Sequence, residues 1–327
     1  VRQAGAVRPL PPAAALQRGA FTVAQARDAG WTRSALRHAV ASDELVVVRK
    51  GVLAVPPAPS GRAWLDAINQ HVLAGAAAVL SRPHGLASHC SAALLLDLPV
   101  LKVPTRPCLT VPRRHTGSIP GVHLHRAVLH RGDPGRLGYL RMTMPARTVI
   151  DIARECGEIA AVVTADGALR RGVLTRDALE FAVAATAGRG GAVAARVVLG
   201  LADPRSESAL ESRSRLAMRA HGLPVPQLQT SIFVSGAFVG RVDFYWDEFG
   251  VVGEADGWEK YRPGWEQVRA EKVRQERLER AGLIVVRWSS DDLRDFGVVA
   301  ARLRDAFARG ALRARSERAW TTRMQPS

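Results

Sequence analysis

The chain has 327 residues, of which 47% are hydrophobic and 23% are charged, and its formal net charge at pH 7 is +16. This length predicts two or three domains, each with its own core, and the composition excludes the disordered and fibrous classes of protein. The excess of positive charge favours a polyanionic partner, with nucleic acid as the first candidate, although an arginine-rich genome would produce the same excess.

Three cysteines, Cys90, Cys108 and Cys156, form an odd set without CxxC spacing. This pattern suggests neither a disulfide framework nor a zinc site. The most apolar stretches, 72–80 and 92–96, are too short to span a bilayer, and the start VRQAGAVRPLPP lacks the apolar core of a signal peptide. We therefore expect a cytoplasmic protein without a membrane partner.

Residues 1–57 contain short helix patterns followed by a basic hairpin. We expect helices over 13–18, 22–29 and 33–42, with Thr22 and Thr32 as N-caps and Gly19 and Gly30 as stops. The segment LVVVRKGVLAV predicts two strands joined by a Lys50-Gly51 turn. Three helices linked by short turns and followed by a hairpin predict a winged helix-turn-helix.

In a winged helix-turn-helix the third helix enters the major groove of DNA. Its exposed side would present four polar residues, Arg33, Ser34, Arg37 and His38. Arg49 and Lys50 on the wing would contact phosphates. The alternative is a three-helix interaction module with a solvated basic face. The segments FTVAQARDAGWTRSALRHAV and VVRKGVLAV resemble the N-terminal domain of AbiEi-type antitoxins, which implies DNA binding and a possible cognate toxin.

After the stiff linker Pro56-Pro57-Ala58-Pro59, residues 61–187 predict an α+β middle domain. The expected helices cover 64–77, 86–96, 146–156, 159–171 and 176–185, and the expected strands lie near 108–111 and 122–125. This order, including the segment MPARTVIDIARE, resembles the second domain of the same antitoxin-like proteins. We find no catalytic constellation in this region.

Several histidines of the middle domain are candidate metal ligands. His123 and His125 share a strand face, with His115 and His130 near them in the sequence. In the sequence no cysteine or carboxylate completes the set, so we favour surface or phosphate contact over metal binding.

Residues 192–310 predict a third domain with a carboxylate pair at its centre. Strands over 238–246 and 251–255, joined by a turn, place Asp243 on one face of the first strand and Glu254 and Asp256 on one face of the second. If these faces coincide, Asp243 and Glu254 converge, and two adjacent carboxylates repel unless a cation lies between them. A hard divalent ion, Mg²⁺ or Mn²⁺, suits such an oxygen-only site.

Five segments follow one another between residues 206 and 308, namely SALESRSRLA, GRVDF, GEADG, EKVRQERLERAG and IVVRW. They carry the residues Glu211, Asp243, Glu254, Asp256, Lys272, Arg274 and Arg287. In this order they resemble the PD-(D/E)XK nuclease superfamily, and more closely the domains related to very-short-patch repair endonucleases. The resemblance implies a mixed sheet flanked by helices and hydrolysis of DNA phosphodiesters.

The resemblance also implies roles. Asp243 and Glu254, with the Ala255 carbonyl, would hold the metal, and Glu211 or Asp256 would complete its shell or orient water. Asp256 stands where the superfamily has its catalytic lysine, so Lys272 or Lys260 would substitute for it. Arg274 and Arg287 would contact nucleic acid. Ser208 and Glu211 also fit a capping box, which is the alternative role of Glu211.

The fold class expected from these segments is a multidomain α+β and α/β protein. Its main predicted function is a Mg²⁺-dependent DNA endonuclease. The alternatives are an antitoxin-like transcriptional regulator with an inactive nuclease-like domain, and a basic protein-interaction scaffold. A homodimer is a further possible assembly. Residues 311–327, which include Arg313, Arg315, Arg318 and Arg323, predict a mobile basic tail.

Overall fold

The computed structural model describes residues 9–82, 84–188, 190–257, 265–312 and 319–324. The chain forms two compact units, Val1–Thr164 with Val173–Gly200, and Ala165–Gly172 with Leu201–Ser327. The described residues contain three sheets, so the mixed α/β class is confirmed. The finer domain boundaries expected near residues 57–61 and 187–192 stay predictions.

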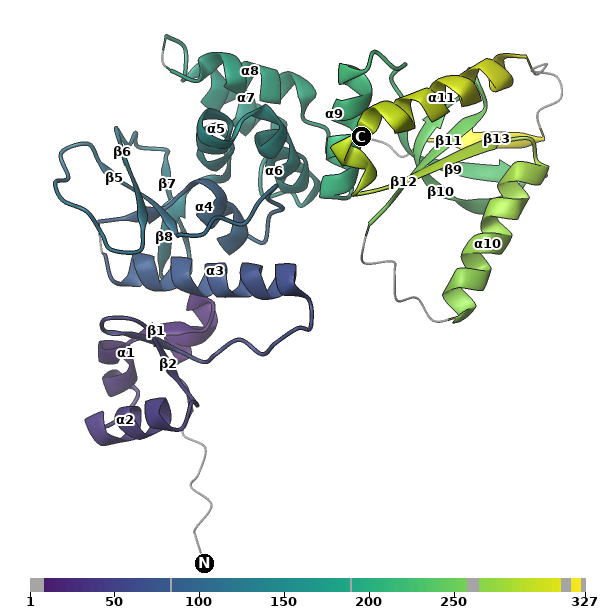
Figure 1. Ribbon diagram of the computed structural model, residues 1–327. Coiled ribbons are helices and arrows are strands. Elements are labelled where there is room, and N and C mark those ends of the chain that lie inside the picture. The colour runs from purple at the N-terminus through teal and green to yellow at the C-terminus, as the bar shows by residue number, and fades with distance from the viewer. Residues whose placement is uncertain (1–8, 83, 189, 258–264, 313–318, 325–327) are drawn as a thin grey trace, which may run out of the picture. The chain divides into compact units, whose positions relative to one another are not determined.

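The first unit begins with the predicted helix-turn-helix (Figure 1). Thr22 caps α1 (Val23–Asp28) by accepting a hydrogen bond from the Gln25 backbone N–H at 3.1 Å, while the Gln25 side chain accepts one from the Thr22 N–H at 2.8 Å. Thr32 caps α2 (Arg33–Ala41) through the Ala35 N–H at 3.2 Å. Both capping predictions are confirmed.

The segment before α1 is a 3₁₀ helix, η1 (Pro12–Gln17), followed by the short strand β1 (Ala20–Thr22), which we did not expect. Strand β1 pairs with β3 (Val52–Ala54), and β3 pairs with β2 (Val46–Arg49), so that the predicted hairpin gains a third strand. Buried apolar residues hold the helices on this small sheet, among them Phe21, Trp31, Leu36, Leu45 and Leu53.

Helix α3 (Ala63–Leu80) runs through the middle of the first unit and packs against β1, β2 and α4 (Figure 1). Its small buried residues, Ala76, Ala77 and Ala78, allow neighbouring elements to approach closely. In the part of the chain that the structure describes, no helix combines the length and the apolar character needed to cross a bilayer.

The second sheet of this unit has the strand order β6-β5-β4-β8-β7. Its strands are β4 (Leu86–Ala87), β5 (Cys108–Pro112), β6 (His123–Ala127), β7 (Pro134–Leu137) and β8 (Leu140–Thr143). The helix expected over 86–96 is wrong at its start, because Leu86 and Ala87 pair with β5 and only α4 (His89–Leu95) is helical. Strands β7 and β8 were not predicted, and β7 begins with Pro134 and Gly135, two residue types that are uncommon in strands.

Three further helices follow the predicted positions closely, and they are α5 (Pro145–Cys156), α6 (Glu158–Arg170) and α7 (Arg176–Ala184). Helix α8 (Ala192–Leu201) comes after them. Pro145 stands in the first turn of α5, where its missing N–H costs no helical hydrogen bond. Thr175 caps α7 through the Ala178 N–H at 3.2 Å.

The second unit contains a mixed sheet with the order β12-β11-β10-β9-β13. Its strands are β9 (Gln227–Val234), β10 (Ala237–Trp246), β11 (Val251–Asp256), β12 (Ile284–Ser289) and β13 (Trp320–Arg323). Strands β9, β10 and β11 are successively antiparallel, whereas β11 and β12 are parallel and are connected through α10 (Trp265–Arg280). A parallel pair requires such a crossover.

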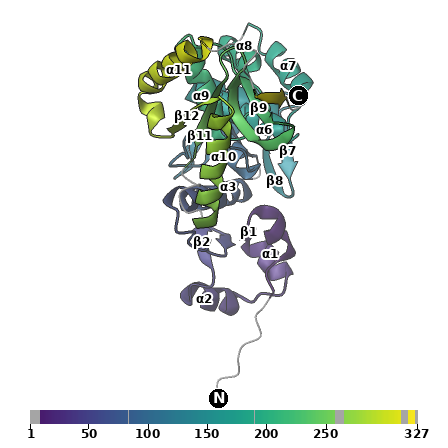
Figure 2. The same ribbon diagram turned by 90° about the vertical axis from the view of Figure 1, so that its right-hand side faces the viewer.

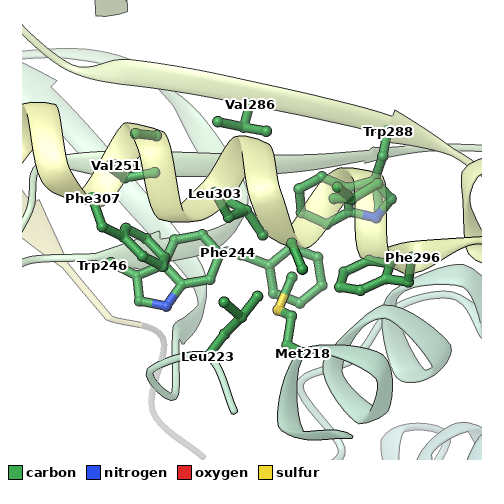
Figure 3. Packing of buried hydrophobic residues seen from close by; sticks show 14 of the residues in the cluster. Met218, Leu223, Phe244, Trp246, Val251, Val286, Trp288, Phe296, Leu303 and Phe307 are labelled. Carbon is green, nitrogen blue, oxygen red and sulfur yellow. The ribbon is translucent and has the colours of Figure 1, made fainter. Parts of the chain in front are cut away.

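Helices cover both faces of this sheet. Helices α9 (Ala209–Ala220) and α11 (Phe296–Ala311) pack on one face, where an aromatic core includes Phe244, Trp246, Trp288 and Phe307 (Figure 3). On the other face, Leu278 of α10 packs with Tyr245 and Val252, and Figure 2 shows α10 lying across the strands. Because alternate residues of a strand share a face, Asp243 and Glu254 belong to the α10 face.

The expected mobile tail is wrong for residues 320–323. These residues form β13 at the edge of the sheet, paired antiparallel with β9. The Trp320 indole N–H donates a hydrogen bond to the Tyr245 hydroxyl at 2.8 Å, which attaches the strand to the sheet. Arg313, Arg315 and Arg318 lie outside the described residues.

Candidate functional site

Helix α2 has the two-sided character that a recognition helix needs. Leu36 and Ala39 are buried against the rest of the helix-turn-helix. All four predicted base-contacting residues are exposed, namely Arg33, Ser34, Arg37 and His38. The buried side therefore fixes the helix, while the polar side is available to a ligand.

The two predicted wing residues differ in their surroundings. Lys50 is exposed in the turn between β2 and β3. Arg49 is half-buried, and its guanidinium donates a hydrogen bond to the Pro120 carbonyl at 3.0 Å. Burial, assisted by repulsion from Arg82, lowers the pKa of Arg49. Lys50 is thus the better placed of the two for a phosphate, and both contacts stay predictions.

The carboxylate pair of the second unit lies on one face, as the strand pattern predicts. In the antiparallel register of β10 and β11, Phe244 pairs with Gly253 and Tyr245 with Val252. Continuing this register by one residue places Asp243 opposite Glu254. Asp243 also accepts a hydrogen bond from the Ala255 backbone N–H at 2.8 Å.

Glu211 of α9 joins the same site while it caps its own helix. Its carboxylate accepts hydrogen bonds from the Ser208 hydroxyl and the Glu207 N–H, each at 2.8 Å. The Gln229 side-chain amide donates to Glu211 at 2.9 Å and to Asp243 at 3.3 Å. Glu211 is thus bonded to the residues that start its helix and also lies beside Asp243, while its role towards a metal or water stays a prediction. Gln229 was missed, because nothing in its strand distinguishes it from other polar residues.

Arg274 of α10 provides the cation that contacts Glu254. Its guanidinium donates to Glu254 at 3.0 Å and to both oxygens of Glu271, at 2.7 and 3.0 Å. Arg287 of β12 also donates to Glu271, and it forms an ion pair with Asp256 at 3.4 Å. These five residues form a chain of alternating charge beside Asp243.

The backbone leaves room for this arrangement at Gly240. A Cβ atom at Gly240 would lie 2.9 Å from the Cδ atom of Arg274, so a side chain there would displace the guanidinium. Two buried donor atoms, Arg274 Nη1 and Arg287 Nε, have no hydrogen-bond partner among the described residues. Unpartnered buried donors of this kind favour the binding of an additional hydrogen-bond acceptor beside them.

Burial controls the protonation of the carboxylates. It raises the pKa of Glu254 to about 7, with Arg274 acting against the shift and Asp243 adding to it. Burial followed by repulsion from Asp243 likewise raises the pKa of Glu211 to about 7. In contrast, hydrogen bonds from Arg274 lower the pKa of Glu271 to about 2. Negative charge is therefore costly at Glu211 and Glu254 and favoured at Glu271.

The predicted divalent ion does not fit the carboxylates as they are arranged here. Asp243 and Glu254 supply the expected oxygen ligands, but Arg274 already neutralises Glu254 and the Ala255 N–H binds Asp243. Among the described residues, the sets of three potential ligand atoms within 4.8 Å of one another do not include these carboxylates. A protein cation thus stands where the resemblance places a metal.

The other predicted catalytic residues contribute little to the site. Lys272 is exposed on α10, and no ion pair joins it to Asp243 or Glu254 in the described part of the chain. Lys260 lies outside the described residues. Arg274 and Arg287, predicted to contact nucleic acid, both bind carboxylates of their own unit. Their nucleic-acid contacts stay predictions.

Comparison with known proteins defines the family. Residues 8–56 match the family described as "Transcriptional regulator, AbiEi antitoxin". The uncharacterized protein Rv2248 of Mycobacterium tuberculosis H37Rv is 38% identical over 191 residues, which cover 56% of this chain and 70% of Rv2248. The chain belongs to the Rv2248 family. The uncharacterized protein MT2308 of Mycobacterium tuberculosis CDC 1551 matches this Rv2248-family chain to the same extent.

The antitoxin-type resemblance of the N-terminal segment is thereby confirmed: this member of the Rv2248 family begins with an AbiEi-type transcriptional regulator domain. Among solved structures, the RV2827C protein from Mycobacterium tuberculosis is 19% identical, with 61% of this chain and 80% of that chain covered and a TM-score of 0.36. A likeness of this size bears on neither fold nor function.

Proposed function

We propose that the chain is a DNA-binding transcriptional regulator of the antitoxin type, and that α2 reads its target in the major groove. The observation that carries this proposal is the match of residues 8–56 to the AbiEi regulator family, combined with the exposed polar side of α2. Arg33 and Arg37 are the candidates for guanine contacts, and Ser34 and His38 lie beside them.

The rest of the chain supports a polyanionic partner. The net charge of +16 supplies the non-specific attraction that brings a regulator to DNA. Lys50, exposed at the tip of the wing, would position the domain by contacting a phosphate. The AbiEi family also suggests a cognate toxin as a protein partner.

In this proposal the nuclease-like domain has no catalytic role. Glu211 and Glu254 are buried and Asp243 is half-buried, and the three carboxylates already have protein partners in Gln229, Arg274 and the Ala255 N–H. The second unit would then serve for binding or for pairing of two chains.

Selection of duplexes from a random DNA pool tests the proposal. The full chain should enrich a defined sequence motif, and Arg37→Ala should relax the preference at one base position, with a loss of about 1–3 kcal/mol in binding free energy. Arg106→Ala is a suitable control, because Arg106 is also exposed but lies outside the helix-turn-helix. The absence of an enriched motif, or equal effects of the two substitutions, would contradict the proposal.

A second candidate function, the Mg²⁺-dependent endonuclease, is supported by the convergence of Asp243, Glu254 and Glu211 on one site. Asp243 and Glu254 would hold Mg²⁺ or Mn²⁺ after Arg274 had moved away. The unpartnered donor atoms of Arg274 and Arg287 support an oxyanion beside them. We derive no catalytic step from the present arrangement.

Incubation of the chain with plasmid DNA and Mg²⁺ or Mn²⁺ separates the two functions. Metal-dependent cleavage that Asp243→Ala and Glu254→Ala both abolish would establish the nuclease. Glu248→Ala is the matched control, because Glu248 is an exposed carboxylate in the turn between the same two strands. DNA binding without cleavage by the parent chain would support the regulator and contradict the nuclease.

A further inference from the structure

A cluster of potential metal ligands lies in the first unit, away from the DNA-binding helix. The sequence alone gave no cysteine or carboxylate beside His123 and His125, and that expectation is wrong. The fold brings His89 of α4, Cys108 of β5 and Glu155 of α5 next to these two residues of β6. The added residues come from separate elements, which explains why sequence spacing did not reveal them.

Glu155 is the point at which the histidines meet. One of its oxygens lies 3.2 Å from His89 Nε2 and 3.4 Å from His125 Nδ1, and its other oxygen lies 3.4 Å from His123 Nδ1. Two ligand atoms of a tetrahedral zinc ion, each about 2.0–2.1 Å from the metal, are about 3.3 Å apart. The observed separations therefore match those of ligands that surround one ion.

Two overlapping sets of ligand atoms occur in the cluster. His89, His125 and Glu155 form one set, and Cys108, His123 and His125 form the other, with the atoms of each set within 4.8 Å of one another. His125 belongs to both. The rings of His89 and His125 are stacked with centroids 3.8 Å apart, and those of His123 and His125 lie 4.3 Å apart.

In the described part of the chain, Glu155 forms its ion pairs with the three histidines rather than with an arginine. Nearby Arg147 is already engaged, because it donates hydrogen bonds to Asp133 at 2.6 Å and to Asp151 at 2.8 Å.

Two further contacts resemble those of metal-bound histidines. The Ser88 hydroxyl lies 2.9 Å from His89 Nδ1, so that Nε2 of the same ring points to Glu155. Partners of this kind fix the orientation of a ligand ring. His125 Nε2 is buried and has no hydrogen-bond partner among the described residues. This nitrogen is not the one that faces Glu155, because His125 Nδ1 makes that contact.

We propose that the first unit binds one transition-metal ion of the zinc type through His89, His125 and Glu155, with a fourth ligand from His123 or Cys108. Imidazole nitrogen, carboxylate oxygen and thiolate sulfur are the donor atoms that zinc takes in proteins. The bound ion would connect α4, α5 and β6, and it would stabilise the unit in proportion to its affinity. This site is independent of the proposed DNA contacts.

Zinc titration of the full chain tests the proposal. After removal of metal with EDTA, the protein is titrated with Zn²⁺ against a chromophoric competitor, and the parent should take up one ion per chain. His89→Gln, His125→Gln and Glu155→Gln should each bind at least about tenfold more weakly. His84→Gln is the matched control, because His84 is an exposed histidine outside the cluster, and it should bind like the parent.

Glu155→Gln keeps the test decisive if a buried histidine variant fails to fold. The Glu155 side chain is 34% exposed, and glutamine has the same shape, so the fold should survive the change. Zinc should also raise the melting temperature of the parent, with a smaller rise for Glu155→Gln. Failure of the parent to bind zinc, or unchanged zinc affinity in Glu155→Gln, would overturn the proposal.

Discussion

Arg274→Gln should destabilise the second unit, because it removes the cation that contacts a buried carboxylate. Glu254 is 2% exposed, and its carboxylate accepts a hydrogen bond from Arg274 at 3.0 Å. Loss of one partner of a buried ion pair costs about 3–5 kcal/mol, because the other charge is left uncompensated. Part of the Arg274 side chain reaches solvent, so we expect a loss of about 3 kcal/mol, near the lower limit.

The loss should depend on pH in a defined direction. Burial raises the pKa of Glu254 from its ordinary value of 4.5 to about 7. A carboxyl with a raised folded pKa contributes stability below its unfolded pKa and loses that contribution as the pH rises through the folded pKa. Glu254 is largely protonated at pH 5 and ionised at pH 8. Arg274→Gln should therefore cost less at pH 5 than at pH 8.

Amide hydrogen exchange of β11 in the full chain measures this effect within the second unit. A loss of about 3 kcal/mol corresponds to exchange more than about 100-fold faster when reclosing is fast, so that exchange follows the opening equilibrium. The double variant Glu254→Gln with Arg274→Gln should recover much of the protection, because residue 254 then carries no charge that needs a partner. Equal exchange in the parent and Arg274→Gln at pH 8, or no recovery in the double variant, would refute the reasoning.

Three further predictions concern other positions. Burial lowers the pKa of His71 below its ordinary 6.5, so stability should fall as the pH falls from 7 to 5, and thermal melts should show a weaker pH dependence for His71→Gln than for the parent. A Cβ at Gly253 would lie 2.7 Å from the Trp288 ring, so Gly253→Ala should cost about 1–3 kcal/mol in denaturant unfolding, and an unchanged midpoint would contradict the packing. Thr32→Ala removes the N-cap of α2 and should cost about 1 kcal/mol, measured by hydrogen exchange of that helix, whereas Thr32→Ser should be nearly neutral.

Local rules predicted the elements that depend on near neighbours in the sequence. The caps Thr22 and Thr32 define their helices through residues three positions away, and both are confirmed. The period-2 pattern placed Asp243 and Glu254 on faces that coincide, because the turn between β10 and β11 sets the register.

The partners of the two carboxylates could not be predicted from the sequence, because only the tertiary fold brings them into contact. Arg274 reaches Glu254 from α10, twenty positions away, and forms an ion pair with it. His89, His123 and His125 depend in the same way on Glu155, which only the packing of α5 brings to them. Tertiary packing, rather than spacing in the sequence, decides which cation neutralises a buried carboxylate.

The sharpest test of the account compares two charge-matched double variants for binding to a selected duplex. Arg33→Ala with Arg37→Ala alters the recognition helix, while Arg106→Ala with Arg131→Ala removes the same charge from exposed positions elsewhere in the first unit. Fluorescence anisotropy at a fixed salt concentration should show a large loss of sequence-specific affinity for the first variant and a small loss for the second. Equal losses would mean that net charge alone attracts DNA, and would contradict reading of DNA by α2.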